Sequence, residues 1–272
     1  MMCPFGGTWT SGGLSLCSMA SCTSRACTSS VGTGQVVVED RQELYFARLH
    51  ELGDPWEGAR PLRLAKRLVE MVGESGPMYD YYRIAASQAV VSCWHENEYE
   101  SVAMWRLYTS GSEGVAVKTT IGRLKRSLAG EPRAITIGRV QYIDHIDHGI
   151  DDDGLAPEID TLSPIFCKRR SFEHEREVRV VIAVPDEREL RNAVAQIPPA
   201  LGQASAVSSS LGDRGLAVPV DMPALVKNIV VSPQFPPWAM EALQRVVDRS
   251  GLAVGVEPSD LLKRPVADLR EM

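Results

Sequence analysis

The sequence lacks any run of apolar residues near the length of about 20 that a membrane-spanning helix needs. Residues 1–34 also lack the basic segment and the continuous apolar segment of a secretory signal. The six cysteines form no C-x-x-C pair, which disfavours a zinc ribbon. We therefore expect a cytoplasmic protein with free thiols and no membrane association.

The chain has no excess of basic residues and no internal repeat. Its formal net charge is −6 at pH 7, so nucleic-acid binding is not implied by the charge. Hydrophobic residues make up 44% of the 272 residues and charged residues 24%, an ordinary globular composition. The chain is long enough for one large domain or two small ones.

Apolar periodicity and turn residues predict short strands interleaved with helices. The predicted helices cover 61–73, 78–88, 101–108, 121–128, 186–196 and 237–249. The predicted strands cover 35–39, 44–48, 89–94, 114–118, 134–144 (one strand or two), 175–184, 216–220, 228–231 and 252–256. Residues 198–215 read as a loop. Because the spacing is not a regular strand–helix–strand repeat, the pattern favours an α+β fold, a mixed and largely antiparallel sheet with packed helices. We expect a single domain over residues 35–262, a disordered low-complexity tail over 1–34 and a C-terminal tail over 263–272.

The stretch SFEHEREVR, residues 171–179, carries the strongest chemical signal. In strand geometry Glu173, Glu175, Glu177 and Arg179 face one side, with same-face neighbours about 6.6–6.8 Å apart. In helix geometry Glu173 and Glu177 instead form a repulsive pair, and Glu175 and Arg179 an attractive one. Buried carboxylates at that spacing repel each other unless a cation compensates them, and Lys168, Arg169 and Arg170 stand just upstream. Glu177 precedes an apolar run, so it is predicted at the mouth of a core strand.

Three other segments carry polar residues. The turn DPWEG, residues 54–58, either serves only as a β-turn or aims Asp54 or Glu57 into a cleft. In CWHENEYESVAMWRLY, residues 93–108, His95 reads as a paired surface histidine or a ligand contact, Trp105 as core and Tyr108 as solvent- or ligand-facing.

The acidic segment around His145 and His148 carries Asp144, Asp147, Asp151, Asp152 and Asp153. It lacks the order of an EF-hand loop and the helical H-E-x-x-H of a zinc protease. A solvated acidic loop is the simpler interpretation, and no metal ligand is assigned.

In combination, these segments resemble a mostly bacterial family, domain of unknown function 2971. The resemblance covers roughly residues 44–261 and rests on YFAR with GDPWEG, on CWHENEYESVAMWRLY with GVAV, and on KRRSFEHEREVR, in that order. The family pattern implies site roles for an aromatic residue, two glutamates, an arginine and an upstream lysine, which here are Phe172, Glu175, Glu177, Arg179 and Lys168. It also implies roles for Asp54, Pro55 and Glu57 of the turn and for Trp105 and Tyr108 of the helix.

The start of the chain departs from the family pattern. Family members begin with an aromatic-basic strand and a helix, and nothing between Met1 and Arg41 supplies them. The resemblance therefore implies that this first strand and helix are missing or replaced by the low-complexity segment.

Three functional hypotheses follow, one of them non-catalytic. The first is an enzyme similar to NAD-using ADP-ribosyltransferases, with Glu175 and Glu177 as the catalytic E-x-E pair, NAD as cofactor and a protein or nucleic-acid target. The second is a binding or scaffold domain in which the charged residues form a structural network. The third is a magnesium-dependent phosphodiesterase using Asp54, Glu57, Glu175 and Glu177, with Lys168 on a phosphate.

Overall fold

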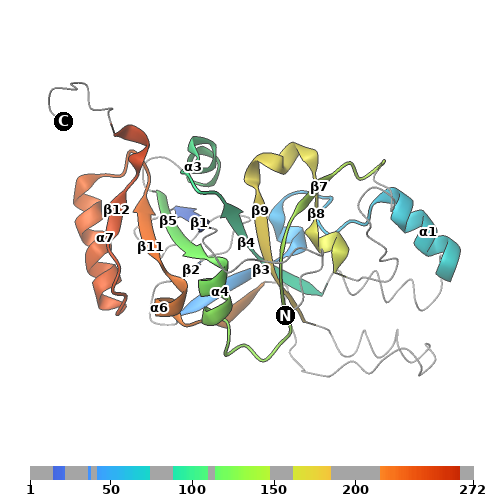
Figure 1. The fold of residues 1–272 in the computed structure, drawn as a ribbon, viewed down its shortest axis with the longest axis horizontal. Coiled ribbons are helices and arrows are strands. Elements are labelled where there is room, and N and C mark those ends of the chain that lie inside the picture. The colour runs from blue at the N-terminus through green and yellow to red at the C-terminus, as the bar shows by residue number, and fades with distance from the viewer. Residues whose placement is uncertain are drawn as a thin grey trace.

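The large sheet at the centre of the molecule carries most of the core. The structure is a computed structural model that describes residues 15–21, 36–37, 42–73, 88–109, 114–147, 162–184 and 215–263. Ten strands in these ranges join one mixed, largely antiparallel sheet, and helices pack against it (Figure 1). The predicted α+β architecture is therefore confirmed.

The sheet is organised around β4 (Ala89–Glu96), which pairs along one edge with β9 (Glu177–Ala183). The other edge of β4 is shared by two strands, β3 (Glu43–Arg48) and β1 (Ser15–Ser21). The remaining strands of the sheet are β2 (Val36–Val37) and β10 (Leu216–Pro219) beside β3, β6 (Ile135–Arg139) beside β9, and β5 (Gly114–Thr120), β11 (Asn228–Val231) and β12 (Val256–Pro258) beyond β1.

The strand β1 corrects the prediction for the start of the chain. Residues 1–34 were expected to form a disordered tail, yet Ser15–Ser21 lies between β4 and β5 and pairs with Gly114–Thr120 along its full length. A serine-rich strand is tolerated there because each paired backbone group gains a ladder partner whatever its side chain. The expectation was wrong for these seven residues, and the rest of 1–34 lies outside the described ranges.

Side chains of β4 and β9 alternate between two differently packed faces. Val90, Trp94 and Val178 join the larger core with α4 (Ile121–Ser127) and α7 (Pro237–Arg249). Val91 and Val181 point the other way, into a smaller core. This smaller core is completed by residues from η1 (Leu49–Leu52) and η3 (Ser163–Phe166). His95 of β4 lies on the same face as Val91, and Glu177 and Arg179 of β9 lie on the same face as Val181. The polar site is therefore on the face with the smaller core.

Local signals place most helices where they were predicted. The helix α1 (Leu62–Val72) ends at Gly73, α3 (Val102–Tyr108) begins after Ser101, and α7 spans 237–249 as predicted. Thr120 caps α4 by accepting the Arg123 N–H at 3.2 Å. A short helix, α6 (Met222–Leu225), precedes β11.

Some predicted elements shift or cannot be compared. The last strand begins at Val256 rather than at Leu252. The stretch 134–144, predicted as one or two strands, forms two, β6 and β7 (Gln141–Ile143). β7 pairs in parallel with β8 (Cys167–Arg169) as a separate ribbon. The predicted helix 186–196, nearly all of the helix 78–88 and the loop 198–214 lie outside the described residues.

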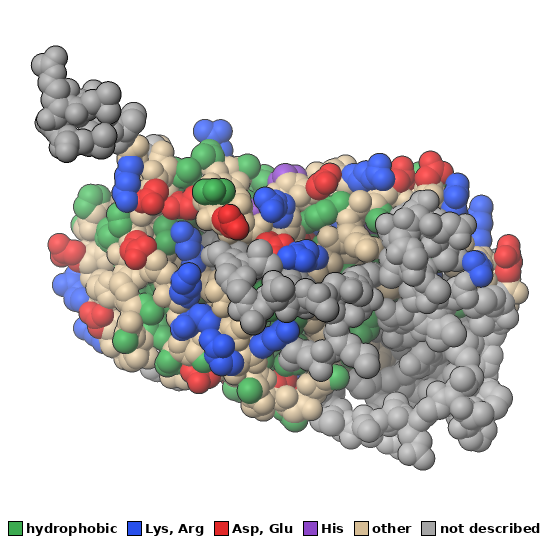
Figure 2. Space-filling model, viewed as in Figure 1, with side chains coloured by type: hydrophobic (Ala, Val, Ile, Leu, Met, Phe, Trp, Pro, Cys, Tyr) green, Lys and Arg blue, Asp and Glu red, His purple; other side chains and the backbone are tan. Residues whose placement is uncertain are grey.

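The surface mixes both charges. Figure 2 shows acidic and basic side chains interspersed on the visible face, with Lys and Arg gathered near α4, whose sequence carries Arg123, Lys125 and Arg126. Among the described residues, no helix has the length and apolarity to cross a membrane.

Candidate functional site

The turn after η1 directs one glutamate inward. Gly53, with φ 82°, ends η1, and Asp54 then accepts the Trp56 N–H at 3.1 Å while its carbonyl accepts the Glu57 N–H at 3.0 Å. This geometry turns the Glu57 side chain into the protein, where it is 1% exposed. The DPWEG segment is thus a turn that also aims a carboxylate.

Lys168 of β8 forms ion pairs with three carboxylates. Its Nζ lies 2.5 Å from Glu175 Oε2, 3.1 Å from Glu177 Oε2 and 3.3 Å from Glu57 Oε1. The ammonium group also lies 4.9 Å from the centre of the Phe172 ring. A buried lysine is unfavourable without such partners, so these contacts explain how Lys168 is accommodated.

Arg179 of β9 is fully buried and holds two of the same glutamates. Its Nε donates to Glu177 Oε1 at 2.7 Å, its Nη2 lies 2.7 Å from Glu57 Oε2, and its Nη1 donates to the Ile165 carbonyl at 2.5 Å. We call Glu57, Lys168, Glu175, Glu177 and Arg179 the ionic cluster. Its three negative and two positive groups leave one net negative charge.

Two further side chains reach the cluster through Glu175. The Tyr108 hydroxyl donates to Glu175 Oε1 at 2.8 Å. His95 Nδ1 lies 2.5 Å from the Glu175 carbonyl, which only accepts, so Nδ1 carries the proton and Nε2 keeps a lone pair. No described residue is a hydrogen-bond partner of this Nε2. Burial lowers the pKa of His95, which keeps the ring neutral near pH 7.

The pKa shifts in the ionic cluster follow from competition between burial and charge. Burial acts to raise the pKa of Glu177, but Arg179 and Lys168 outweigh it and lower the pKa to about 2. Burial acts to lower the pKa of Lys168, yet the glutamates around it raise the pKa above its ordinary value. For Tyr108, burial and then the Glu175 carboxylate both raise the pKa, so the phenol stays protonated. Glu177 and Lys168 are therefore both charged at neutral pH.

The backbone around Glu175 differs from the strand that was predicted. Residues Arg170–Glu175 form a 3-10 helix, η4, and Arg176 adopts a left-handed conformation with φ 42° and ψ 55° before β9 begins at Glu177. Glu175 and Glu177 were expected on the same face of one strand, and this expectation was wrong. They still meet at Lys168, which they contact from the end of η4 and the start of β9.

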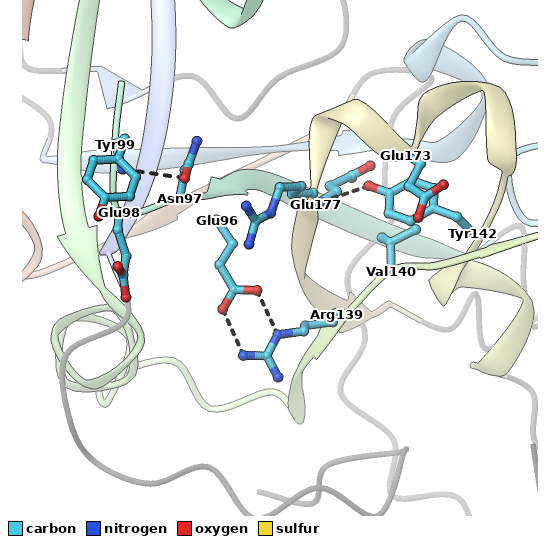
Figure 3. A pocket seen from close by; sticks show the side chains of 10 residues that line it. Glu96, Asn97, Glu98, Tyr99, Arg139, Val140, Tyr142, Glu173 and Glu177 are labelled. Atoms are coloured by element: carbon cyan, nitrogen blue, oxygen red, sulfur yellow. Dashed lines mark hydrogen bonds and ion pairs between the residues drawn. The ribbon is translucent and has the colours of Figure 1, made fainter. Parts of the chain in front are cut away.

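A pocket of about 530 Å³ opens at the Glu177 end of the ionic cluster (Figure 3). It lies where β4 ends, β6 ends and β9 begins. The pocket is lined by Glu96, Asn97, Glu98, Tyr99, Arg139, Val140, Tyr142, Glu173, Arg176 and Glu177. Its volume is within the range of about 300–1,000 Å³ that is usual for small-molecule sites.

Two contacts shape the wall of this pocket. Arg139 donates to Glu96 from both Nε and Nη2, at 2.6 and 2.8 Å, in the parallel arrangement that Figure 3 shows. The Tyr142 hydroxyl accepts the Glu177 N–H at 2.7 Å, which holds the first residue of β9 at the pocket. The Arg176 side chain, by contrast, is exposed and has no hydrogen-bond or ion-pair partner among the described residues.

The structure brings together most of the side chains that were predicted as site residues. Those that converge are Glu57, His95, Tyr108, Lys168, Glu175, Glu177 and Arg179. Asp54 lies beside them and holds Arg169 through two hydrogen bonds, at 2.8 and 3.1 Å. Trp105 does not join, because it is 4% exposed in a core with Met104 and donates its indole N–H to Glu100. Of the whole set, only Glu177 lines the pocket.

Sequence reasoning assigned no site role to most of the pocket lining, including Glu96, Arg139, Tyr142 and Arg176. Arg139 and Tyr142 lay in a stretch predicted only as strand, and their pairing with Glu96 and with the backbone of Glu177 depends on strands distant in sequence. Arg176 stood inside the SFEHEREVR stretch, but an arginine in the sequence does not by itself indicate a positive φ. The signal to seek was a change from turn to strand geometry at this residue.

The acidic segment does not add a metal site within the described residues. His145 packs its ring against Trp56 with centroids 5.4 Å apart, and Asp147 lies 3.9 Å from Arg63. No group of three or more His, Cys, Asp or Glu side chains in the described ranges is arranged to hold a metal ion. His148 and Asp151–Asp153 lie outside those ranges.

Comparison of the chain with protein-family models, with curated proteins and with solved structures finds no match. The functional interpretation therefore depends on the geometry of the site.

Proposed function

We propose that this chain is a nucleotide-binding domain whose pocket over Glu177 takes a ligand with a diphosphate group, such as NAD. One observation carries the proposal: Arg176 holds a left-handed backbone, unusual for a residue with a side chain, and presents an unpaired guanidinium at the pocket. Such strain persists where the surrounding structure imposes it and is concentrated at ligand sites. A guanidinium is also the side chain best suited to phosphate oxygens.

The ionic cluster supports this proposal by fixing Glu177, its one member that lines the pocket. Its carboxylates are already paired with Lys168 and Arg179, so the cluster is a rigid, charged base rather than a set of free ligands. Tyr142 and Tyr99 add aromatic rings to the wall, and Tyr99 is 79% exposed. Rings of this kind offer stacking surfaces for a nicotinamide or an adenine.

The resemblance to domain of unknown function 2971 is part of the same proposal. Seven residues that match its motifs, Asp54, Glu57, Tyr108, Lys168, Glu175, Glu177 and Arg179, lie in or beside the ionic cluster. This convergence of separate motifs in one place supports family membership for the chain.

Cleavage of NAD at this pocket is the second candidate function. It is favoured by Glu177, which lines the pocket and whose carboxylate is ionised. In that reaction the bond between the ribose and nicotinamide breaks, nicotinamide leaves with the bonding electron pair, and the carboxylate stabilises the positive charge on the ribose. An acceptor nucleophile or water then forms the new bond and loses its proton. Glu175 is turned away towards Tyr108 and Lys168, so Glu177 would act without the second glutamate.

The magnesium-dependent phosphodiesterase has less support. Asp54 is held by Arg169, and Glu57, Glu175 and Glu177 are held by Lys168 or Arg179. A cation would have to displace these side chains before the four carboxylates could bind it.

Isothermal titration calorimetry with NAD and ADP-ribose tests the proposal. We expect saturable binding to the full chain and a loss of at least about tenfold in affinity for Arg176→Gln, since hydrogen bonds to charged groups contribute about 1.5–3 kcal/mol. Arg126→Gln, which removes an exposed arginine from α4, is the matched control and should bind like the wild type. Equal affinity for Arg176→Gln and wild type, or no binding of either ligand, would contradict the proposal.

Nicotinamide release separates the two candidates. If the chain cleaves NAD, chromatography will detect nicotinamide with wild type and with Arg126→Gln, and none with a folded Glu177→Gln variant. Binding of NAD without release by the wild type would reject the catalytic candidate and leave the binding function.

A further inference from the structure

A second pocket, of about 290 Å³, lies beside the turn that carries Trp56. It shares no residue with the pocket over Glu177 and does not depend on the function proposed for that pocket. Its lining is Trp56, Ile143, Asp144, His145, Ile146, Arg169, Arg170 and Ser171. The two arginines come from the KRR run, whose lysine alone enters the ionic cluster.

One arginine of this pocket is held in place with a free edge. Arg169 donates to Asp54 through Nε and Nη2, at 3.1 and 2.8 Å, and its guanidinium lies 5.5 Å from the centre of the Phe172 ring. The Asp54 side chain is 2% exposed, so this anchor is rigid. The Nη1 group has no hydrogen-bond acceptor among the described residues and keeps two N–H groups for a ligand.

The second arginine supplies an exposed positive charge. After the Ile146 N–H, this charge also lowers the pKa of Asp144 in the same lining. Arg170 is exposed, and none of the described residues forms a hydrogen bond or an ion pair with its side chain. The adjacent Ser171 adds a hydroxyl, which is exposed as well. Two neighbouring guanidinium groups and a hydroxyl are the donors that bind a phosphate group.

A flat aromatic wall faces the same space. Trp56 is 39% exposed, and its ring stands at 59° to the His145 ring, with centroids 5.4 Å apart. The exposed part of an indole ring is a strong stacking surface for a base. Ile143 and Ile146 add apolar contact area.

A carboxylate at the pocket limits how much negative charge the ligand carries. Asp144 accepts the Ile146 N–H at 2.9 Å and is therefore fixed in the lining. Its charge opposes a di- or triphosphate more strongly than a monophosphate. The pocket volume, at the lower end of the usual range for small ligands, also fits a mononucleotide.

We propose that this second pocket binds a nucleoside 5′-monophosphate, with the base against Trp56 and the phosphate between Arg169 and Arg170. Base stacking and phosphate recognition come from different residues, so each can be removed without the other. Both Trp56 and Arg170 are exposed, which makes their replacement compatible with folding.

Calorimetric titration with AMP in the Arg176→Gln background tests this proposal, because that background disables the pocket over Glu177. We expect AMP to bind with a single site and adenosine to bind at least about tenfold more weakly, since it lacks the phosphate. Adding Arg170→Gln or Trp56→Leu should each weaken AMP binding by about tenfold or more. Adding Arg126→Gln, the matched control, should leave the AMP affinity within about twofold of the background.

The outcomes are separable from those of the first pocket. AMP binding that persists unchanged in both Arg170→Gln and Trp56→Leu would overturn this proposal, as would the absence of AMP binding in the Arg176→Gln background. Circular dichroism of each variant confirms that it is folded. Failure of NAD to bind the wild type concerns only the first pocket.

Discussion

At the scale of single residues, Glu177 connects the buried ionic cluster to the open pocket. Both carboxylate oxygens are used inside, on Arg179 and Lys168, while the residue itself lines the pocket. Burying several charges is costly, and a cluster of this kind is stable only as long as every member keeps its partners. The stability of the fold and the shape of the pocket therefore depend on the same side chain.

Replacement of Glu177 by Gln should destabilise the protein by about 3–5 kcal/mol, because Arg179 and Lys168 would remain buried with one carboxylate fewer. Glu173→Gln, an exposed glutamate of the same motif, should change stability by no more than about 0.5 kcal/mol. Urea unfolding of both variants measures the difference. Equal stabilities would show that the buried contacts are not stabilising.

The change of stability with pH also tests the buried contacts of Glu177. The pKa of Glu177 is about 2 in the folded protein and about 4.3 in an unfolded chain, so the folded state favours the charged form. Its contribution is complete above about pH 4.3 and is lost as the pH falls towards 2. Between pH 5.5 and pH 3, the free energy of unfolding should therefore fall more steeply for wild type than for Glu177→Gln. Parallel pH curves would contradict the assignment.

Glu96 occupies on Arg139 the two positions that a phosphate of the ligand would take. We expect Glu96→Gln to tighten NAD binding severalfold, since a carboxylate that holds Arg139 through two charged hydrogen bonds and opposes the diphosphate is neutralised. Glu98→Gln removes a charge from the same pocket lining but none that holds Arg139, and should have the smaller effect. Calorimetry measures both affinities; a weaker affinity in Glu96→Gln would argue that the pair is needed intact.

At the scale of elements, the join between η4 and β9 positions the site. The left-handed Arg176 links η4 to β9, and Glu175 and Glu177 contact Lys168 from these two different elements. A left-handed conformation costs a non-glycine residue about 1–2 kcal/mol. The strain is retained at the position where the side chain meets the pocket.

Arg176→Gly should therefore separate stability from binding. Glycine adopts the conformation without strain, so stability should rise by about 0.5–1 kcal/mol after its greater unfolded-state entropy is counted. NAD binding should fall by at least about tenfold, as for Arg176→Gln. Urea unfolding and calorimetry give the two values; lower stability together with intact binding would refute this account of Arg176.

The sequence predicted elements best where the signal was local. The apolar periodicity, the proline and the glycine around α7 predicted its limits, and Thr120 predicted the start of α4. The motif residues Glu57, Lys168 and Arg179 were also predicted as site residues, but whether they converge was left open. What failed depended on tertiary context: a 3-10 helix in place of a strand at Glu175, and a pocket wall from Arg139 and Tyr142 whose partners lie on other elements.

At the scale of the whole molecule, the strand β1 joins two parts of the sheet. It pairs with β4 on one side and with β5 on the other, so β5, β11 and β12 connect to β4 through it. Nothing in its composition predicted this position. A serine- and cysteine-containing segment has weak strand preference, and its place follows from unpaired backbone edges that only the assembled sheet presents.

Ser18→Pro should destabilise the full chain by about 3 kcal/mol or more, because proline cannot donate to the ladder of a central strand. Ser18 lies opposite Val117 in the register of β1 and β5. Ser18→Thr, which favours strand geometry, is the matched control and should be as stable as wild type or slightly more stable. Equal urea unfolding midpoints for the two variants would show that β1 does not support the sheet.

The central claim is that the pocket over Glu177 binds a nucleotide diphosphate through Arg176. A crystal structure of the full chain with ADP-ribose tests it most directly. We predict that the diphosphate lies against the Arg176 guanidinium and that the terminal ribose, which carries no adenine, points towards Glu177. A ligand bound elsewhere, or a pocket that stays empty at saturating ADP-ribose, would contradict the claim.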